Sequence, residues 1–222
     1  VQYAAKLKNE NGYPQVLSVQ STKNARERAY KVQKSLFDNG LSKSINIAMQ
    51  STDPHTLEQV KRDNISISDY KELQKRFSND GVPTYVDFII GLPGDNYEKF
   101  SNSISDLISS GQHNRIQYNN LSILPNAEMA QKAYLKKYQL KTIEAPIVNM
   151  HGSLDETPED GIYETQKLVI STKDMPLNDW IKTRIYASTS EYLYFNKILQ
   201  IPFLLVYFLH PNISFKNIFE NF

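Results

Sequence analysis

Three times along the chain, a short apolar run is followed by an amphipathic stretch that stops at a glycine. The apolar runs cover residues 14–20, 44–50 and 83–90, and the stretches after them end at Gly40, Gly81 and Gly111. This pattern predicts strands alternating with helices. A fourth strand is predicted over residues 115–123. Strands that alternate with helices at intervals of roughly 30 residues pair in parallel through right-handed crossovers. We therefore predict four neighbouring parallel strands, in a doubly wound sheet or a TIM-type barrel.

Turn and capping residues support these boundaries. Asn24, Asp53 and Asp95 each stand just before an amphipathic stretch, where a short polar side chain caps the first turn of a helix. Pro93 and Gly94 suit the two central positions of a type II turn, because proline presets the first φ and glycine accepts the positive second one.

The pattern changes after about residue 125, where turn signals and helical stretches replace the strand-helix unit. We predict a βα portion over residues 1–130 and a mainly helical C-terminal extension over residues 131–222 that packs on the sheet. The most apolar run, residues 201–209, is far shorter than the roughly 20 residues that span a bilayer. A buried helix is the preferred interpretation, and no membrane span is predicted.

Composition narrows the function classes. The chain has 222 residues, is 40% hydrophobic and 22% charged, and has a formal net charge of +1. It therefore lacks the basic footprint of a nucleic-acid-binding protein, so we expect a small molecule or another protein as partner. The opening "VQYAAKLKNENGYP" resembles the end of a helix rather than a signal peptide. We expect a cytoplasmic protein, of which this chain is a fragment.

Metal and hydrolase chemistry find no support. The chain has no cysteine, so it offers no thiolate zinc site and no cysteine-held iron-sulfur cluster. Its four histidines lack metal-ligand spacing, and no G-x-S-x-G elbow is present. We predict no metal ligand within the chain.

The candidate site lies where the predicted strands end, because ligands of parallel α/β proteins bind at the carboxyl ends of the strands. Polar residues gather there: Gln20, Gln50, Ser51 and Asn120, with Asp87 further back in its strand. Asp87 stands in the apolar run "VDFII", where a carboxylate is unfavourable unless it is paired. It needs either a ligand with hydroxyl donors or an internal cation such as Arg62 or Lys61.

Three segments together resemble the later part of a radical S-adenosylmethionine (SAM) enzyme core, in the class that often carries a cobalamin-binding domain in front. They are "INIAMQSTDPHTLEQVKRDNIS", "VDFIIGLPGDNYEKF" and "NNLSILPNAEM". The resemblance implies a partial TIM-type barrel of six βα units, of which this chain supplies about the last four. It also implies an iron-sulfur cluster held by C-x-x-x-C-x-x-C. That motif is absent here, so the cluster, and cobalamin if used, belong to upstream segments.

The same resemblance suggests cofactor-binding residues. Arg62 would pair with the SAM carboxylate, although it equally suits a solvated helix end. Gln50 would contact the ribose or the amino-acid part of SAM, and Asp87 the ribose diol. Gly91 and Leu92 would place backbone groups along the adenine. Gln20, Lys23, Asn24, Asn120 and Asn126 are further candidates facing cofactor or substrate, and no catalytic residue is identified.

The function implied is the SAM-binding later portion of a radical SAM enzyme that acts on an unactivated carbon, with a cobalamin-linked methylation as one reaction. Its partner would be the upstream N-terminal half of the same enzyme, and the chain by itself would be inactive. The alternative is a non-catalytic, truncated or split barrel segment that serves binding or association. Cluster cysteines encoded upstream would favour the enzyme.

Overall fold

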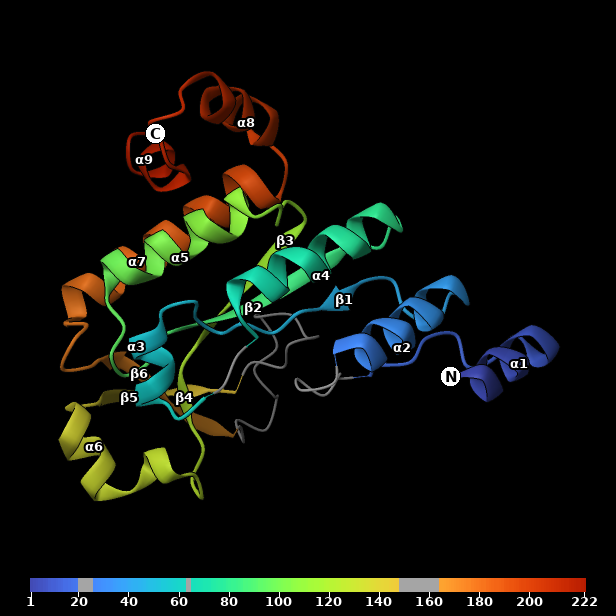
Figure 1. The fold of residues 1–222 in the computed structure, drawn as a ribbon. Helices are drawn as coiled ribbons and strands as arrows, with labels where there is room; N and C mark the ends of the chain where they lie inside the picture. Colours follow the sequence, from blue (N-terminus) through green and yellow to red (C-terminus); the bar gives the residue numbers. More distant parts are fainter. Residues whose placement is uncertain (20–25, 63–64, 148–163) are drawn as a thin grey trace, which may run out of the picture.

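A three-stranded parallel sheet forms the centre of the molecule (Figure 1). The computed structural model of the chain describes residues 1–19, 26–62, 65–147 and 164–222. The sheet contains β1 (Ile45–Asn46), β2 (Thr84–Ile90) and β3 (Arg115–Asn120), in the order β1-β2-β3. Both strand pairs are parallel, with Ile45 opposite Thr84 and Tyr85 opposite Arg115. The predicted parallel pairing of these three segments is confirmed, and the chain is a mixed α/β protein.

The helices begin and end largely as the sequence pattern predicts. Gly40, Gly81 and Gly111, which follow three of them, have positive φ values of 64°, 70° and 100°. Glycine reaches this region without a steric penalty, so it stops the helices there. The helices are α1 (Gln2–Asn11), α2 (Arg26–Asp38), α3 (Pro54–Gln59), α4 (Ile67–Asn79), α5 (Tyr97–Ser109), α6 (Lys132–Tyr138), α7 (Leu177–Thr189), α8 (Gln200–Leu209) and α9 (Phe215–Glu220), with a 3-10 turn η1 (Glu128–Ala130) and a π-helical turn η2 (Ser190–Phe195).

One face of the sheet packs against helices. Along β2 the side chains alternate between buried and half-buried, and Val86, Phe88 and Ile90 are on the buried side. They join a core cluster with side chains of α4, α5 and α7, and the rings of Phe88 and Phe100 meet edge to face at 5.8 Å. The opposite face of the sheet lies outside this helical layer.

A second, antiparallel sheet follows at the carboxyl end of β3. It contains β4 (Ser122–Ile123), β5 (Lys141–Pro146) and β6 (Thr165–Ser171), in the order β4-β6-β5. The single strand predicted over residues 115–123 therefore breaks at Leu121. The Leu121 amide still donates to the Ile90 carbonyl at 2.9 Å, while its carbonyl accepts from the Val169 amide at 2.9 Å. Leu121 thus joins the two sheets.

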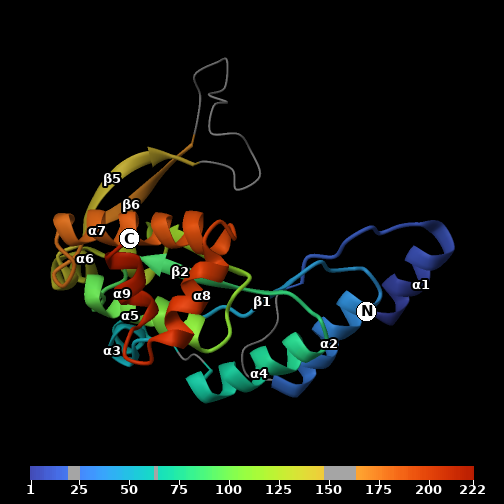
Figure 2. The ribbon, with the colours of Figure 1, turned by 90° about the horizontal axis from the view of Figure 1, so that it is seen from above.

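The strand predicted over residues 14–20 is wrong for the part described, residues 14–19, which form no strand. Val16 and Val19 are 53% and 43% exposed, so this apolar run is not buried against the sheet. Its backbone instead bonds to neighbouring loops and helices: the Leu17 amide donates to Leu41, and the Val19 carbonyl accepts from Gln33. Figure 2 shows α1 and α2 at one end of the molecule, away from α7, α8 and α9.

The apolar run at residues 201–209 forms α8, but the prediction that it is buried is wrong. Phe203 is buried, whereas Ile201, Phe208 and Leu209 are each at least 70% exposed. No single helix in the described part of the chain is long and apolar enough to cross a membrane. The segment Leu177–Phe195 and α8 together pass that test by length and composition only, with a bend of 97° between them.

The predicted helix caps and the predicted turn have different outcomes. Asp53 caps α3, accepting from the Thr56 amide at 2.8 Å, as predicted. Asp95 does not cap α5, because the neighbouring Asn96 accepts from the Lys99 amide at 2.9 Å. The turn before it is confirmed by the Asp95 amide, which donates to the Leu92 carbonyl at 3.1 Å. The third predicted cap, Asn24, lies outside the described residues.

Candidate functional site

Gln50 and Asp87 are neighbours on adjacent strands. The Gln50 amide donates to the Asp87 carbonyl at 2.8 Å, and the Gln50 carbonyl accepts from the Ile89 amide at 3.1 Å. Gln50 has a φ of 61° and pairs with Phe88 in an isolated parallel bridge. Ile45 pairs with Thr84, so the segment leading to Gln50 contains one residue more than the matching part of β2. The positive φ accompanies this irregularity and places Gln50 beside β2.

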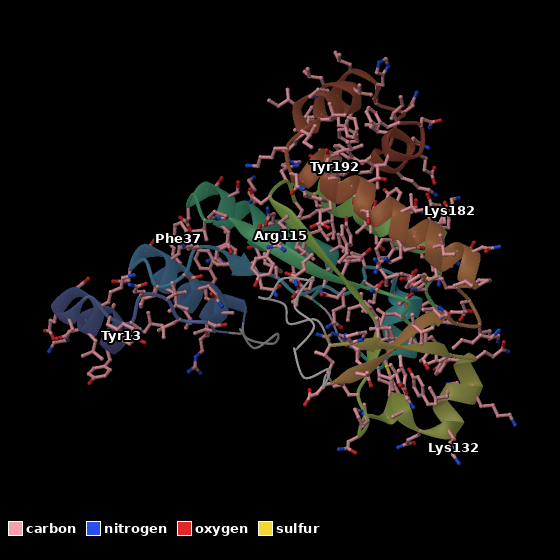
Figure 3. All side chains as sticks on the ribbon, turned by 180° about the vertical axis from the view of Figure 1, so that it is seen from behind. Tyr13, Phe37, Arg115, Lys132, Lys182 and Tyr192 are labelled. Carbon is pink, nitrogen blue, oxygen red and sulfur yellow. The ribbon has the colours of Figure 1, made fainter. Side chains whose placement is uncertain are left out.

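The face of the sheet opposite the helices carries mostly polar side chains. In a parallel pair, residues in register point to the same face, and Asp87 is opposite Gln117 while Ile89 is opposite Asn119. These four side chains are half-buried, and Arg115, at the start of β3, is exposed. Arg115 lies near the middle of the molecule when it is seen from behind (Figure 3).

The Asp87 carboxylate is held by an amide rather than by a cation. Asn46, on β1, donates through Nδ2 to Asp87 Oδ2 in a very short contact. The other side of the same amide, Asn46 Oδ1, is buried and has no hydrogen-bond partner. Among the described residues Asp87 forms no salt bridge, so the internal ion pair with Arg62 or Lys61, considered from the sequence, is not made.

Among the described residues, the guanidinium group of Arg62 has no counterion. Its Nε is buried without a hydrogen-bond partner, and no carboxylate of the described chain lies within salt-bridge distance. Burial lowers the pKa of Arg62 because the charged form loses solvation. The neighbouring Lys61 differs: its Nζ contacts Glu128 Oε1 at 2.5 Å, with both side chains more than half exposed. Of the two cations, Arg62 is therefore the one available to an anionic ligand.

Gly91 and Leu92 follow β2 at a place that other side chains cover. A Cβ atom on Gly91 would lie 3.6 Å from Val169 and 3.7 Å from Trp180, and the φ of Gly91 is 91°. Leu92 is 2% exposed and packs in a second apolar cluster with Leu121 and Val169. Neighbouring side chains thus surround both Gly91 and Leu92. The predicted contact of their backbone with adenine stays a prediction.

Two loops at the carboxyl ends of β1 and β2 are joined by a cluster of polar contacts. Lys99 Nζ lies 3.0 Å from Asp53, 3.1 Å from His55 Nδ1 and 2.8 Å from the Gly94 carbonyl. Gly94 itself has no room for a side chain, because a Cβ would lie 2.9 Å from Gln59 Cγ. The contacts of Lys99 therefore hold the loop after Gln50 against the loop after Gly91.

Two carboxylates in these loops have opposite pKa shifts. Asp95 is 1% exposed, and burial raises its pKa to about 7, despite a hydrogen bond from the Asn96 amide. Burial alone would also raise the pKa of Asp53, but hydrogen bonds from Thr56 and Lys99 outweigh it, so the pKa is lowered. Burial of Asp95 could not be predicted from the sequence, because an aspartate after a turn is equally typical of a helix cap.

The remaining candidates are dispersed. Asn120 has a buried Oδ1 without a partner, whereas Asn126 is exposed in the turn closed by the Ala127 amide and the Leu124 carbonyl. Gln20, Lys23 and Asn24 lie outside the described residues. Sequence reasoning missed Asn46, because its contact with Asp87 depends on the register between β1 and β2, which the sequence pattern does not show.

The residues suit one implied cofactor and not another. The chain has no cysteine, and its described residues contain no group of three histidines or acidic residues that could hold a metal. It therefore does not fit an iron-sulfur cluster. Within the described part of the chain, Arg62 pairs with no carboxylate and Asp87 with no cation, so these two groups fit a ligand with a carboxylate and hydroxyl groups, such as SAM.

Comparisons with known proteins give two sequence relatives of the chain. No family model matches the chain. It is 30% identical over 190 residues to the cobalamin-dependent radical SAM methyltransferase TokK of Streptomyces tokunonensis, covering 86% of this chain. It is also 29% identical over 183 residues to a 2-(S-pantetheinyl)-carbapenam-3-carboxylate methyltransferase of Streptantibioticus cattleyicolor, covering 82% of this chain. The chain spans 27% and 26% of these relatives, about a quarter of their length.

Among solved structures, the chain is similar to the radical S-adenosylmethionine methyltransferase TsrM of Kitasatospora setae, with tryptophan and a SAM analogue bound, at 14% identity and a TM-score of 0.43. The match covers 68% of this chain and 32% of TsrM. That score is too low to assign the fold. The sequence matches are the stronger finding: the chain is a relative of cobalamin-dependent radical SAM methyltransferases.

Proposed function

We propose that the chain is the SAM-binding later portion of a radical SAM methyltransferase that acts on an unactivated carbon with cobalamin. The observation that carries the proposal is Arg62, whose guanidinium is partly buried and has no counterion among the residues that the structure describes. The names of the two sequence relatives support the reaction class. The partial TIM-type barrel belongs to the same proposal, with β1, β2 and β3 as three of its parallel strands.

Each proposed role follows from what the side chain can offer. Arg62 binds the SAM carboxylate, because a guanidinium forms two parallel hydrogen bonds with a carboxylate. Asp87 accepts from the ribose hydroxyls, and Gln50, beside it, can both donate to and accept from the ligand. Gly91 and Leu92 contribute backbone groups near the adenine.

SAM supplies a methyl group for transfer and, on reductive cleavage, a radical that abstracts hydrogen. The chain's own contribution is to bind, orient and shield. The apolar cluster of Leu92, Leu121, Ile123 and Val169 excludes water from the end of β2. The contacts of Lys99 hold the two neighbouring loops together, which keeps Gln50 in place. All residue roles proposed for this chain concern SAM, and the chain has no cysteine to hold a cluster. Binding of the cluster and of cobalamin therefore belongs, in this proposal, to an upstream N-terminal segment.

The binding roles of Arg62 and Asp87 predict a specific loss. In the full-length protein, Arg62→Ala and Asp87→Asn should each weaken binding of S-adenosylhomocysteine by about 1 to 3 kcal/mol, because each removes a charged hydrogen bond. Isothermal titration calorimetry measures this loss. Lys61→Ala is the matched control, since Lys61 contacts only the exposed Glu128 among described carboxylates and should leave the affinity unchanged. Unchanged affinity with a lower melting temperature would show that Arg62 and Asp87 are structural.

A second candidate function is favoured by the absence of cysteine. A barrel segment without cluster ligands can bind a ligand or associate with a partner without catalysis. Association with a cysteine-containing polypeptide, followed by SAM cleavage, favours the enzyme. Stable association with no cleavage favours the non-catalytic function.

A further inference from the structure

Helix α8 exposes an apolar stripe on the side opposite its contacts with α9. On the inner side, the Phe203 ring meets Phe219 of α9 edge to face at 5.5 Å, and the Tyr207 ring stacks on Phe215 at 4.4 Å. On the opposite side of the helix lie four apolar residues, each more than half exposed: Ile201, Leu205, Phe208 and Leu209. We call these four residues the α8 stripe. Because the inner rings anchor the helix, the stripe is presented on a fixed element.

We propose that the α8 stripe is the contact between two copies of this chain, in a two-fold symmetric dimer whose α8 helices cross at Leu205. Ile201, Leu205 and Leu209 are four residues apart, so they form one ridge along the helix. Two ridges of this kind interdigitate when the helices cross at about −50°. Leu205 is the middle residue of the ridge, so the two-fold axis passes beside it. The contact involves none of the proposed SAM-binding residues and is tested separately from the proposed function.

The area of the stripe suits a dimer contact. Ile198 and Val206 are exposed beside it, so six large apolar side chains contribute. At about 100 Å² each, they present roughly 600 Å² per copy, and a pair would bury on the order of 1,200 Å², the lower end of the range for stable interfaces. An apolar patch of this size is as large as the largest patch on a typical soluble monomer, and such patches mark interaction sites.

Charge favours a second copy over a membrane surface. α8 contains no Lys, Arg, Asp or Glu, and the nearest such residues along the chain are Lys197 and Lys216. Lys216 is buried and contacts Glu98, which leaves Lys197 as the exposed one of the two. Helices that lie on a lipid surface are typically rich in Lys and Arg, which attract anionic headgroups. An uncharged stripe, by contrast, meets a copy of itself without like-charge repulsion.

The position of α8 separates it from the edge at which earlier strands of the proposed barrel would join. β1 is one edge of the parallel sheet, and those strands would pair there. The C-terminal helices are instead tied to β3, the other edge, where the hydroxyl groups of Tyr118 and Ser190 are 2.7 Å apart. Figure 2 shows α8 on the side of the molecule away from α1 and α2. The α8 stripe therefore remains accessible to a second copy of the chain.

Because the chain has no cysteine, a single introduced cysteine tests the contact directly. In a two-fold symmetric dimer, a residue beside the axis meets its own copy. On mild oxidation, Leu205→Cys should therefore form a disulfide-linked dimer, detected on a non-reducing gel. Ile185→Cys is the matched control, because Ile185 is a similarly exposed apolar residue on α7, outside the stripe, and should stay monomeric on that gel.

Sedimentation equilibrium measures the same contact without oxidation. The wild-type chain should have twice the single-chain mass of 25.6 kDa. Leu205→Glu should raise the dissociation constant of the dimer on the order of 100-fold, because it places two like charges against each other, and Ile185→Glu should leave it unchanged. Both residues are exposed, so both variants should keep the wild-type circular dichroism spectrum.

A monomeric wild-type chain refutes the proposal, and so does a dimer that Ile185→Glu disrupts and Leu205→Glu does not. Wild-type chains that bind phosphatidylserine vesicles as monomers would assign the stripe to a lipid surface instead. A dimer that is lost when the chain is joined to its upstream segment would assign the stripe to that segment. Each of these results refutes the dimer and leaves the S-adenosylhomocysteine test of Arg62 and Asp87 unaffected.

Discussion

Replacing Asp95 with asparagine is expected to raise stability relative to wild type as the pH rises from acid to alkaline values. Burial raises the pKa of Asp95 to about 7, from a usual value of 3.8. The folded protein therefore holds this proton over a range in which the unfolded chain has released it. Wild-type stability should fall as pH rises from about 4 to 7, and the asparagine variant lacks this loss. Relative to wild type, the variant should gain about 4 kcal/mol between pH 3 and pH 8.

The measurement is the free energy of unfolding in urea across that pH range. Asp53→Asn is the matched control, because the pKa of Asp53 is lowered and its contribution has the opposite sign. Asp53 stabilises the fold above its unfolded pKa, and that stability is lost as pH falls, so Asp53→Asn should be most destabilising at neutral pH. If the curves of wild type and Asp95→Asn run parallel from pH 3 to pH 8, the carboxyl group does not hold its proton in the folded protein.

The parts of the fold that the sequence could predict are those in which local and tertiary preferences agree. The segment around β2 is a mostly apolar run between two turns, and its helix-facing side chains are buried, so its strand was predictable. Residues 14–19 have a similar apolar pattern, but Val16 remains exposed and no strand forms. A short apolar run indicates a strand only where a sheet is available to cover it.

The antiparallel sheet escaped prediction for the complementary reason. Five of the six residues of β5 are exposed, so the segment Lys141–Pro146 carries almost no apolar signal. Its hydrogen bonds to β6 decide its conformation, and such long-range pairing cannot be read from local composition. In α8, a run of apolar residues predicted burial, but most of the helix is exposed. Composition alone does not determine which surface covers a helix.

At the candidate site, residue type was more informative than position. Asp87 stood out because a carboxylate in an apolar strand requires a partner, and the structure provides Asn46 rather than Arg62. Asp95 and Asn96 could both cap a helix, and the structure shows Asn96 as the cap and Asp95 as the buried residue. Asn46 could not be assigned from sequence, because its role depends on the register between β1 and β2.

The 222-residue chain is expected to bind no iron-sulfur cluster and to cleave no SAM by itself. Cluster ligation requires thiolates, and the chain has none. After anaerobic reconstitution with iron and sulfide, the purified chain should be colourless, and chromatography should detect no 5′-deoxyadenosine with a reductant. Joined to an upstream segment that contains C-x-x-x-C-x-x-C, it should give a brown protein that cleaves SAM. Arg62→Ala in the joined protein is the control, since it should keep the colour but weaken S-adenosylhomocysteine binding. Reductive cleavage by the isolated chain would refute its dependence on an upstream segment, and a joined protein that binds a cluster but never cleaves SAM would refute the assignment of this chain as the cofactor-binding portion.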